Sequence, residues 1–268
     1  MTGWQGSRIE RLPSCSRRTP STRRATLPHS AAAQVVSGLW HLVVDAKYLM
    51  QGNLFMPSEK YDVNTVVFDL GGVLVDWNPR HLFRKLFDGD EAAMETFLKE
   101  ICNSAWNEKQ DRGRPWSEAI DEAIAQYPLH AHHIRAYRER WDEMLGGALE
   151  ETVEVLNELH HSGVRILALT NWSAETFHIA EQRFGFLEKF EGILVSGRER
   201  MMKPEPEIFQ LLISRYDLTP SRTLFIDDVQ ANVDAAVEQG LLALQFTSAL
   251  QLRNELREIG LPIAVAGK

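Results

Sequence analysis

The chain has 268 residues, of which 44% are hydrophobic and 25% charged, and its net charge is −8. Such a composition is typical of a globular protein, and no run approaches the roughly 20 apolar residues of a membrane-spanning helix, so we expect no membrane partner. The acidic balance argues against a nucleic-acid partner, and two cysteines make no disulfide framework, which favours a reducing, cytoplasmic compartment.

Residues 1–60 differ from the rest in charge. They hold eight Lys/Arg and three Asp/Glu, a net of +5, so the remainder carries −13. Arginine, serine and proline dominate residues 1–30 without apolar periodicity, which predicts a disordered or weakly structured extension, and residues 31–50 could form a short helix. The same composition is typical of an organelle transit peptide, but we favour an upstream extension of the reading frame, with Met50 or Met56 as the natural start.

The first convincing element is the apolar run Val66–Phe68, which predicts a short strand buried on both faces of a parallel sheet. Asp69 follows it at once, and a carboxylate there is costly unless it reaches an open site or a cation. Gly71 and Gly72 let the backbone turn sharply and leave room for a ligand close to the main chain. The plain alternative is a strand that ends in a polar turn.

Residues 81–146 read as an all-helical insert, in which no convincing strand appears from residue 82 to 146. Helices are predicted over residues 79–87, 91–101, 116–126 and 129–145. A polar loop runs from Trp106 to Trp116, and Gly146-Gly147 closes the insert like a hinge. We interpret residues 81–146 as a cap that acts as a lid, and residues 61–80 and 147–260 as the core domain.

From residue 149 onward, helices and strands alternate. Strands are predicted over 164–169, 192–195, 223–226 and 241–246, with helices over 149–162, 174–184, 203–216, 231–239 and 250–259. This alternation predicts an α/β fold, a doubly wound parallel sheet of Rossmann-like type that carries the helical insert.

Ligands bind such sheets at the carboxyl ends of the strands, and the polar residues of this sequence converge there. Carboxylates at neighbouring strand ends repel one another unless a cation lies between them, and hard oxygen ligands suit Mg²⁺. The predicted metal ligands are Asp69, Asp228 and the Gly71 carbonyl. Helix capping is the alternative for the Asp227-Asp228 pair.

Two further strand ends offer groups that suit an anion. Lys203 could neutralise both Asp69 and a phosphoryl oxygen, and Thr170 and Asn171 supply a hydroxyl, an amide and backbone N–H groups. The alternatives are a solvated surface lysine and an ordinary N-cap.

The order D-L-G-G-V, L-T-N, K-P and F-I-D-D resembles the four motifs of the haloacid dehalogenase-like (HAD) hydrolase superfamily, from residue 61 to about 260. The insert resembles the cap of the first subclass of this superfamily, and the sequence D-L-G is similar to the corresponding motif of sugar-phosphate phosphatases. The resemblance implies a Mg²⁺-dependent hydrolase of a small phosphorylated metabolite, with Asp69 as the nucleophile and an aspartyl-phosphate intermediate. It assigns phosphate binding to Thr170, Asn171 and Lys203, and Mg²⁺ binding to Asp228 and more loosely to Asp227. Gly72, which leaves room for a ligand close to the main chain, is a further candidate for phosphate binding.

One departure from the family pattern is Gly71, which stands where family phosphatases carry a second aspartate as general acid and base. We therefore expect a steep dependence on leaving-group acidity unless another residue supplies the proton. Asp76 could do so, although we favour it as a cap of the helix that Pro79 opens. Two alternatives stay open: a 2-haloacid dehalogenase that uses Asp69 on carbon without metal, and a non-catalytic protein that binds a phosphorylated ligand.

The loop between the two tryptophans of the insert is predicted to contact the part of the substrate remote from the chemistry. Its candidate residues are Trp106, Asp111 and Arg112. The alternative is that both tryptophans are packing anchors. Monomer and homodimer are both compatible with the sequence.

Overall fold

The computed structural model describes residues 62–264, so the predictions for residues 1–60 fall outside the described part of the chain. Its centre is a five-stranded parallel sheet in the order β5-β4-β1-β6-β7. The strands are β1 (Thr65–Phe68), β4 (Arg165–Thr170), β5 (Gly192–Val195), β6 (Thr223–Asp227) and β7 (Leu242–Gln245). The predicted α/β fold is therefore confirmed.

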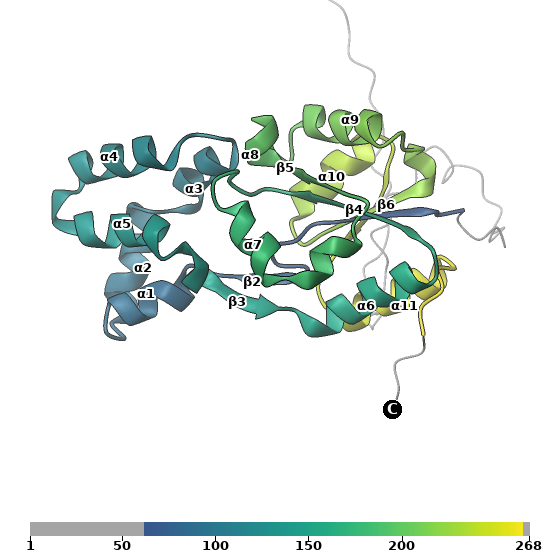
Figure 1. Cartoon of the computed structure of the whole chain (residues 1–268), viewed down its shortest axis with the longest axis horizontal. Coiled ribbons are helices and arrows are strands. Elements are labelled where there is room, and N and C mark those ends of the chain that lie inside the picture. Colours follow the sequence, from purple (N-terminus) through teal and green to yellow (C-terminus); the bar gives the residue numbers. More distant parts are fainter. Residues whose placement is uncertain (1–61, 265–268) are drawn as a thin grey trace, which may run out of the picture. The chain divides into compact units, whose positions relative to one another are not determined.

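Helices cover both faces of this sheet because alternate residues of each strand point to opposite sides. Val67 packs with residues of α9 (Pro206–Arg215) and α10 (Gln230–Glu238) on one face. Val66 and Phe68 pack with residues of α6 (Glu150–His161) and α11 (Ala249–Glu258) on the other. Figure 1 shows the two helix pairs on opposite sides of the strands.

The helical insert leaves the core through a two-stranded antiparallel ribbon, made of β2 (Val75–Trp77) and β3 (Leu145–Ala148). Between these strands lie α1 (Arg80–Leu86), α2 (Glu91–Glu100), α3 (Ser104–Asp111), α4 (Trp116–Gln126) and α5 (Ala131–Glu139), with short 3₁₀ turns at Pro128–His130 and Trp141–Met144. We call the segment from α1 to Met144 the cap.

The ribbon corrects two expectations. The insert was expected to contain no strand up to residue 146, yet β3 begins at Leu145, and the glycine pair Gly146-Gly147 lies inside this strand rather than in a free hinge. Both strands are short, and β3 holds two glycines, so neither carries the apolar alternation by which strands are recognised.

The polar loop expected over Trp106–Trp116 is helical in its first half, because α3 runs to Asp111. Asn103 starts this helix: its Oδ1 accepts a hydrogen bond from the backbone N–H of Trp106 at 2.9 Å. The true connection is residues 112–115, where Gly113 has φ +96°.

Three helices begin or end at residues other than those predicted. The helix expected over 129–145 ends at Glu139, the one expected from Lys203 begins at Pro206, and the one expected from residue 174 is α7 (Phe177–Arg183). A one-turn helix, α8 (Ser196–Glu199), follows β5 directly. These differences leave more irregular chain at the carboxyl ends of β4 and β5 than the sequence indicated.

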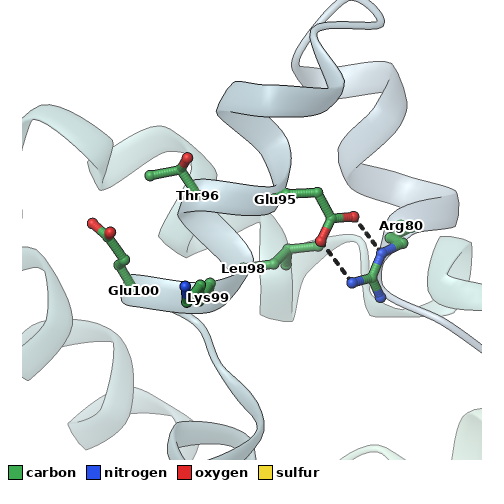
Figure 2. Close-up of a pocket in the computed structure, with 6 residues that line it drawn as sticks. All are labelled: Arg80, Glu95, Thr96, Leu98, Lys99 and Glu100. Carbon is green, nitrogen blue, oxygen red and sulfur yellow. Dashed lines mark hydrogen bonds and ion pairs between the residues drawn. The ribbon is translucent and has the colours of Figure 1, made fainter.

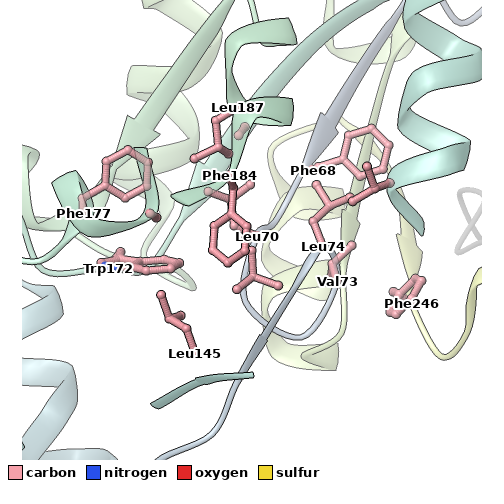
Figure 3. Packing of buried hydrophobic residues seen from close by; sticks show 14 of the residues in the cluster. Phe68, Leu70, Val73, Leu74, Leu145, Trp172, Phe177, Phe184, Leu187 and Phe246 are labelled. Carbon is pink, nitrogen blue, oxygen red and sulfur yellow. The ribbon is translucent and has the colours of Figure 1, made fainter. Parts of the chain in front are cut away.

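The turn after β1 is fixed by apolar side chains that are buried in the core. Leu70, Val73 and Leu74 are fully buried, and Figure 3 shows them among Phe68, Leu145 and other core residues. Within residues 62–264, no helix has the length and apolar character needed to cross a membrane.

Candidate active site

The strand register brings Asp69 and Asp227 together at one edge of the sheet. Phe68 pairs with Ile226, and the backbone N–H of Asp69 donates to the carbonyl of Ile226 at 2.8 Å. The two aspartates thus end neighbouring strands, β1 and β6.

Lys203 lies between these two carboxylates and is almost completely buried. Its Nζ is 2.9 Å from Asp69 Oδ1 and 2.6 Å from Asp227 Oδ2. Burial lowers the pKa of Lys203, but attraction to Asp227 and Asp69 and hydrogen bonds to both outweigh it, so the net shift is upward. The ammonium is therefore charged, and the solvated-surface reading of this lysine is wrong.

Asp69 is buried and has one oxygen already occupied. Oδ1 receives the Lys203 ammonium and the backbone N–H of Leu70, the latter at 2.7 Å. Burial raises the pKa of Asp69 to about 7; Lys203 opposes this shift and Asp227 adds to it. A further cation next to Asp69 would favour its ionised form.

Asp227 is fully buried, and protein donors occupy both of its oxygens. Oδ1 accepts from the Val229 N–H at 2.9 Å, Oδ2 accepts from Lys203, and the Asn232 amide donates to both, at 2.9 and 3.1 Å. Asn232 was not among the expected site residues. It reaches Asp227 from the first turn of α10, a contact that no motif in the sequence indicates.

Asp228 differs from Asp227 in that its side chain reaches solvent. Burial raises its pKa, with a second contribution from Asp227. One carboxylate oxygen from each of Asp69, Asp227 and Asp228 lies within 4.8 Å of the others, an arrangement that could hold a metal ion.

Gly72 stands against this carboxylate. A Cβ at Gly72 would lie 2.5 Å from Asp228 Oδ2, and the residue has φ +74°. Its N–H donates to the Val75 carbonyl at 2.9 Å and is thereby engaged within the turn. The close approach that requires glycine here is thus that of the Asp228 carboxylate.

Asn171 is committed to Lys203 rather than to helix capping. Its Nδ2 donates to the Lys203 carbonyl at 2.9 Å, and its Oδ1 accepts from the Lys203 N–H at 2.9 Å. Thr170 is buried at the end of β4, and within residues 62–264 its hydroxyl makes no hydrogen bond. The hydroxyl is therefore available to a ligand.

Gly71 and Asp76 occupy different surroundings. A Cβ at Gly71 would meet nothing within 4 Å, so this position is open space. Asp76 lies in β2 and its Oδ2 is 2.9 Å from Nε2 of His81. The N-cap residue of α1 is Pro79, and the side chain that bonds to the first turn is Asn78, whose Oδ1 accepts from the Arg80 N–H at 3.0 Å, so the capping interpretation of Asp76 is wrong.

The expected cap residues have separate roles. Trp106 packs edge-on against Trp116 and Tyr137, with ring centroids 5.6 and 5.1 Å away, as a packing anchor would. Arg112 forms an ion pair with Glu205, which closely follows Lys203 in the core. Asp111 ends α3, and burial raises its pKa well above the ordinary range.

A pocket on the cap, of about 380 Å³, is lined by residues of α1 and α2 and contains none of the strand-end residues. Its arginine is already neutralised, because Arg80 forms two hydrogen bonds with the Glu95 carboxylate (Figure 2). Its second cation, Lys99, is balanced by the charge of Glu100, so the pocket has no net positive charge to attract a phosphate.

Comparisons with known proteins agree with the motif order. The sesquiterpene phosphatase AstK of Aspergillus oryzae is 30% identical over 194 residues, which cover 72% of this chain and 94% of that enzyme. The GMP/IMP nucleotidase YrfG of Escherichia coli is 25% identical over 195 residues, 67% of this chain and 81% of the enzyme.

Among solved structures, the HAD family enzyme BT-2542 of Bacteroides thetaiotaomicron, in complex with magnesium and inorganic phosphate, has a TM-score of 0.54. It is 24% identical, and the match covers 69% of this chain and 95% of that one, which shows a shared fold. The family model for haloacid dehalogenase-like hydrolases matches residues 63–240. The chain therefore belongs to the haloacid dehalogenase-like hydrolases.

Proposed function

We propose that this hydrolase is a Mg²⁺-dependent phosphomonoesterase that cleaves small phosphate esters through an aspartyl-phosphate on Asp69. The observation that carries the proposal is the charge arrangement at the sheet edge: one buried lysine faces Asp69 and Asp227, and a third carboxylate, Asp228, stands beside them.

The free oxygen atoms of the site suit a hard cation, whereas Asp227 is bound to Lys203. Asp227 has both oxygens occupied by N–H donors, whereas Asp228 and the second oxygen of Asp69 receive no side-chain donor from residues 62–264. Asp69, Asp228 and the Gly71 carbonyl would hold Mg²⁺, with Asp227 as a looser contributor through its charge. The ion would supply charge neutralisation for the phosphoryl oxygens.

The protein groups then divide the chemistry among them. One carboxylate oxygen of Asp69 attacks phosphorus while the other would contact the cation, and the bond between phosphorus and the leaving oxygen breaks. Lys203 and the Thr170 hydroxyl bind phosphoryl oxygens, and Asn171 keeps the Lys203 main chain in place. Water then attacks the phosphorus of the aspartyl-phosphate, which releases phosphate and restores Asp69.

The cap would select the leaving group. Trp106 would contribute apolar surface and Arg112 a cation near the core. The names of the relatives suggest which esters to try: isoprenoid alcohol phosphates from AstK, and nucleoside monophosphates from YrfG.

The test is a panel of sugar, nucleotide, isoprenoid and aryl phosphates, each assayed for released phosphate with Mg²⁺ and with EDTA. We expect Mg²⁺-dependent turnover that Asp69→Asn lowers by several orders of magnitude while the melting temperature is kept, because an amide neither attacks phosphorus nor binds Mg²⁺ well. Activity in that variant within about tenfold of the parent would contradict the mechanism.

The same assay separates the alternatives. Halide release from 2-haloacids that EDTA does not affect would identify a dehalogenase; one solved dehalogenase has the same fold, with a TM-score of 0.53. A protein that hydrolyses nothing, yet is stabilised against heat by one phosphorylated compound, would be a binding protein.

A further inference from the structure

The cap and the core meet at Asp111, the last residue of α3. The Asp111 carbonyl accepts a hydrogen bond from Ser196 Oγ at 2.6 Å, and the same Oγ accepts from the Trp172 N–H at 2.9 Å. Ser196 and Trp172 follow the carboxyl ends of β5 and β4, respectively. The backbone of Asp111 is therefore tied to the edge of the sheet where the strand-end aspartates lie.

Two further contacts fix this part of the cap against the core. Gly113 has φ +96°, and a Cβ there would lie 2.9 Å from the carbonyl oxygen of Gly197. The intervening Arg112 pairs with Glu205. The segment 111–113 is thus held by backbone packing, a hydrogen bond and an ion pair, which is more than a connection between α3 and α4 requires.

The Asp111 side chain is half-buried, and its carboxyl contacts both the cap and the core. Its Oδ2 accepts from the Asn107 amide at 2.8 Å. Burial raises its pKa well above the ordinary range; hydrogen bonding from the Ser173 N–H opposes this, and the charges of Glu108 and Asp69 add to it. Ser173, whose N–H contacts this carboxyl, is three residues beyond Thr170, so the carboxyl lies at the end of β4 where the site residues lie.

Two other groups that could carry a proton to the leaving oxygen are paired with other side chains, and Asp228 is the proposed metal ligand. Asp76 is bound to His81, and Lys203 is bound to two carboxylates. Gly71 has no side chain, although the space beside it is open.

From this geometry we propose that Asp111 is the general acid and base of the reaction, supplied by the cap in place of a carboxylate at position 71. The inference rests on the proposed phosphomonoesterase function. As Asp69 attacks phosphorus and the P–O bond to the alcohol breaks, the Asp111 carboxyl gives its proton to the leaving oxygen, and the alcohol departs neutral. The resulting carboxylate takes a proton from the water that attacks the aspartyl-phosphate, so phosphate leaves and both aspartates return to their starting state.

The test compares kcat/KM for 4-nitrophenyl phosphate, whose leaving group needs no proton, with kcat/KM for alkyl phosphates. In Asp111→Asn we expect the alkyl esters to lose about 10²–10⁴-fold. We expect 4-nitrophenyl phosphate to change little in kcat/KM and to show a burst of 4-nitrophenolate, since hydrolysis of the aspartyl-phosphate then lacks its base. Equal losses on both ester classes, or none, would overturn the proposal.

Ser196→Ala is the matched control, because it removes the hydrogen bond to the Asp111 main chain and keeps the carboxyl. It should lower the melting temperature and slow both ester classes by the same factor. If Asp111→Asn does not fold, the parent enzyme provides the test through a series of esters whose leaving alcohols differ in pKa. Its kcat/KM should fall only shallowly as the pKa of the leaving alcohol rises. A steep fall would overturn the proposal. A parent that hydrolyses no phosphate ester would instead refute the phosphomonoesterase function, and the role of Asp111 with it.

Discussion

The side-chain amide of Asn171 holds the main chain of Lys203 through both of its polar atoms, each at 2.9 Å. This contact joins the end of β4 to the irregular segment before α9. It fixes the residue whose ammonium lies between Asp69 and Asp227. Asn171 was predicted to bind phosphate; this contact uses one N–H and one oxygen lone pair of its amide, and the second N–H stays available for that role.

The first prediction follows from this contact. Asn171→Ala should lower kcat by about 10²-fold with little change in KM, because the Lys203 ammonium loses its fixed position. Asn171→Asp keeps the acceptor for the Lys203 N–H and loses the donor to its carbonyl, so it should lie between the parent and the alanine variant. Steady-state kinetics of both variants, with any substrate found in the phosphate-ester panel, measures kcat and KM. A raised KM with unchanged kcat would favour direct contact between Asn171 and the phosphoryl group.

A second prediction concerns the buried ion pairs themselves. Lys203→Met leaves the Asp69 and Asp227 carboxylates facing each other without a cation, and removing one partner of a buried pair costs about 3–5 kcal/mol. Urea unfolding should show this loss. The double variant Lys203→Met/Asp227→Asn removes one of the stranded charges and should recover part of the stability without recovering activity. Recovery of activity would show that Lys203 is structural only.

The sheet and the polar residues at its strand ends could be predicted from the sequence. Val66–Phe68 and the run over 223–226 are short, apolar and followed at once by aspartates, so both the buried strands and their polar ends could be predicted. Lys203 could be placed near Asp69 because its proline-marked turn follows a predicted strand.

What could not be predicted depends on contacts between distant segments. Asn232 reaches Asp227, and Ser196 reaches Asp111 across 85 positions, yet each looks like an ordinary polar residue at the start of a helix. The ribbon of β2 and β3 was missed because glycine replaces the apolar alternation. Helix α3 was missed because its residues, Ser104–Asp111, are mostly polar and show little apolar periodicity.

The third prediction separates the two adjacent glycines. Gly72→Ala places a methyl group against the Asp228 carboxylate and forces φ +74° on a residue with a Cβ. If Asp228 binds Mg²⁺, the concentration needed for half-maximal activity and for thermal stabilisation should rise about 10–100-fold. Gly71→Ala is the control, because its methyl group would meet no atom within 4 Å. An equal effect of the two substitutions would indicate that the turn, and not Asp228, controls Mg²⁺ binding.

Arg112 gives the fourth prediction. Its side chain pairs with Glu205 of the core and is half exposed. If it contacts the leaving group, Arg112→Ala should lower kcat/KM by about 10–100-fold for anionic or hydroxylated substrates and barely slow a small aryl phosphate. Arg114→Ala is the matched control, because Arg114 pairs with Gln110 and Glu122 inside the cap. A uniform loss across the panel would assign Arg112 to cap docking alone.

The last prediction uses the empty space at Gly71. Gly71→Asp introduces a carboxylate two residues after the nucleophile, where a Cβ meets nothing and the backbone does not have a positive φ. In the parent, this substitution should change the alkyl esters little, since Asp111 already supplies their proton. In the Asp111→Asn background, it should restore much of the roughly 10²–10⁴-fold loss on alkyl phosphates and leave 4-nitrophenyl phosphate almost unchanged in kcat/KM. Gly71→Asn in the same background is the control, because its amide fills the space and has no proton to give. A large gain on alkyl esters when Gly71→Asp is made in the parent would mean that no efficient acid was present, and that Asp111 serves only to dock the cap.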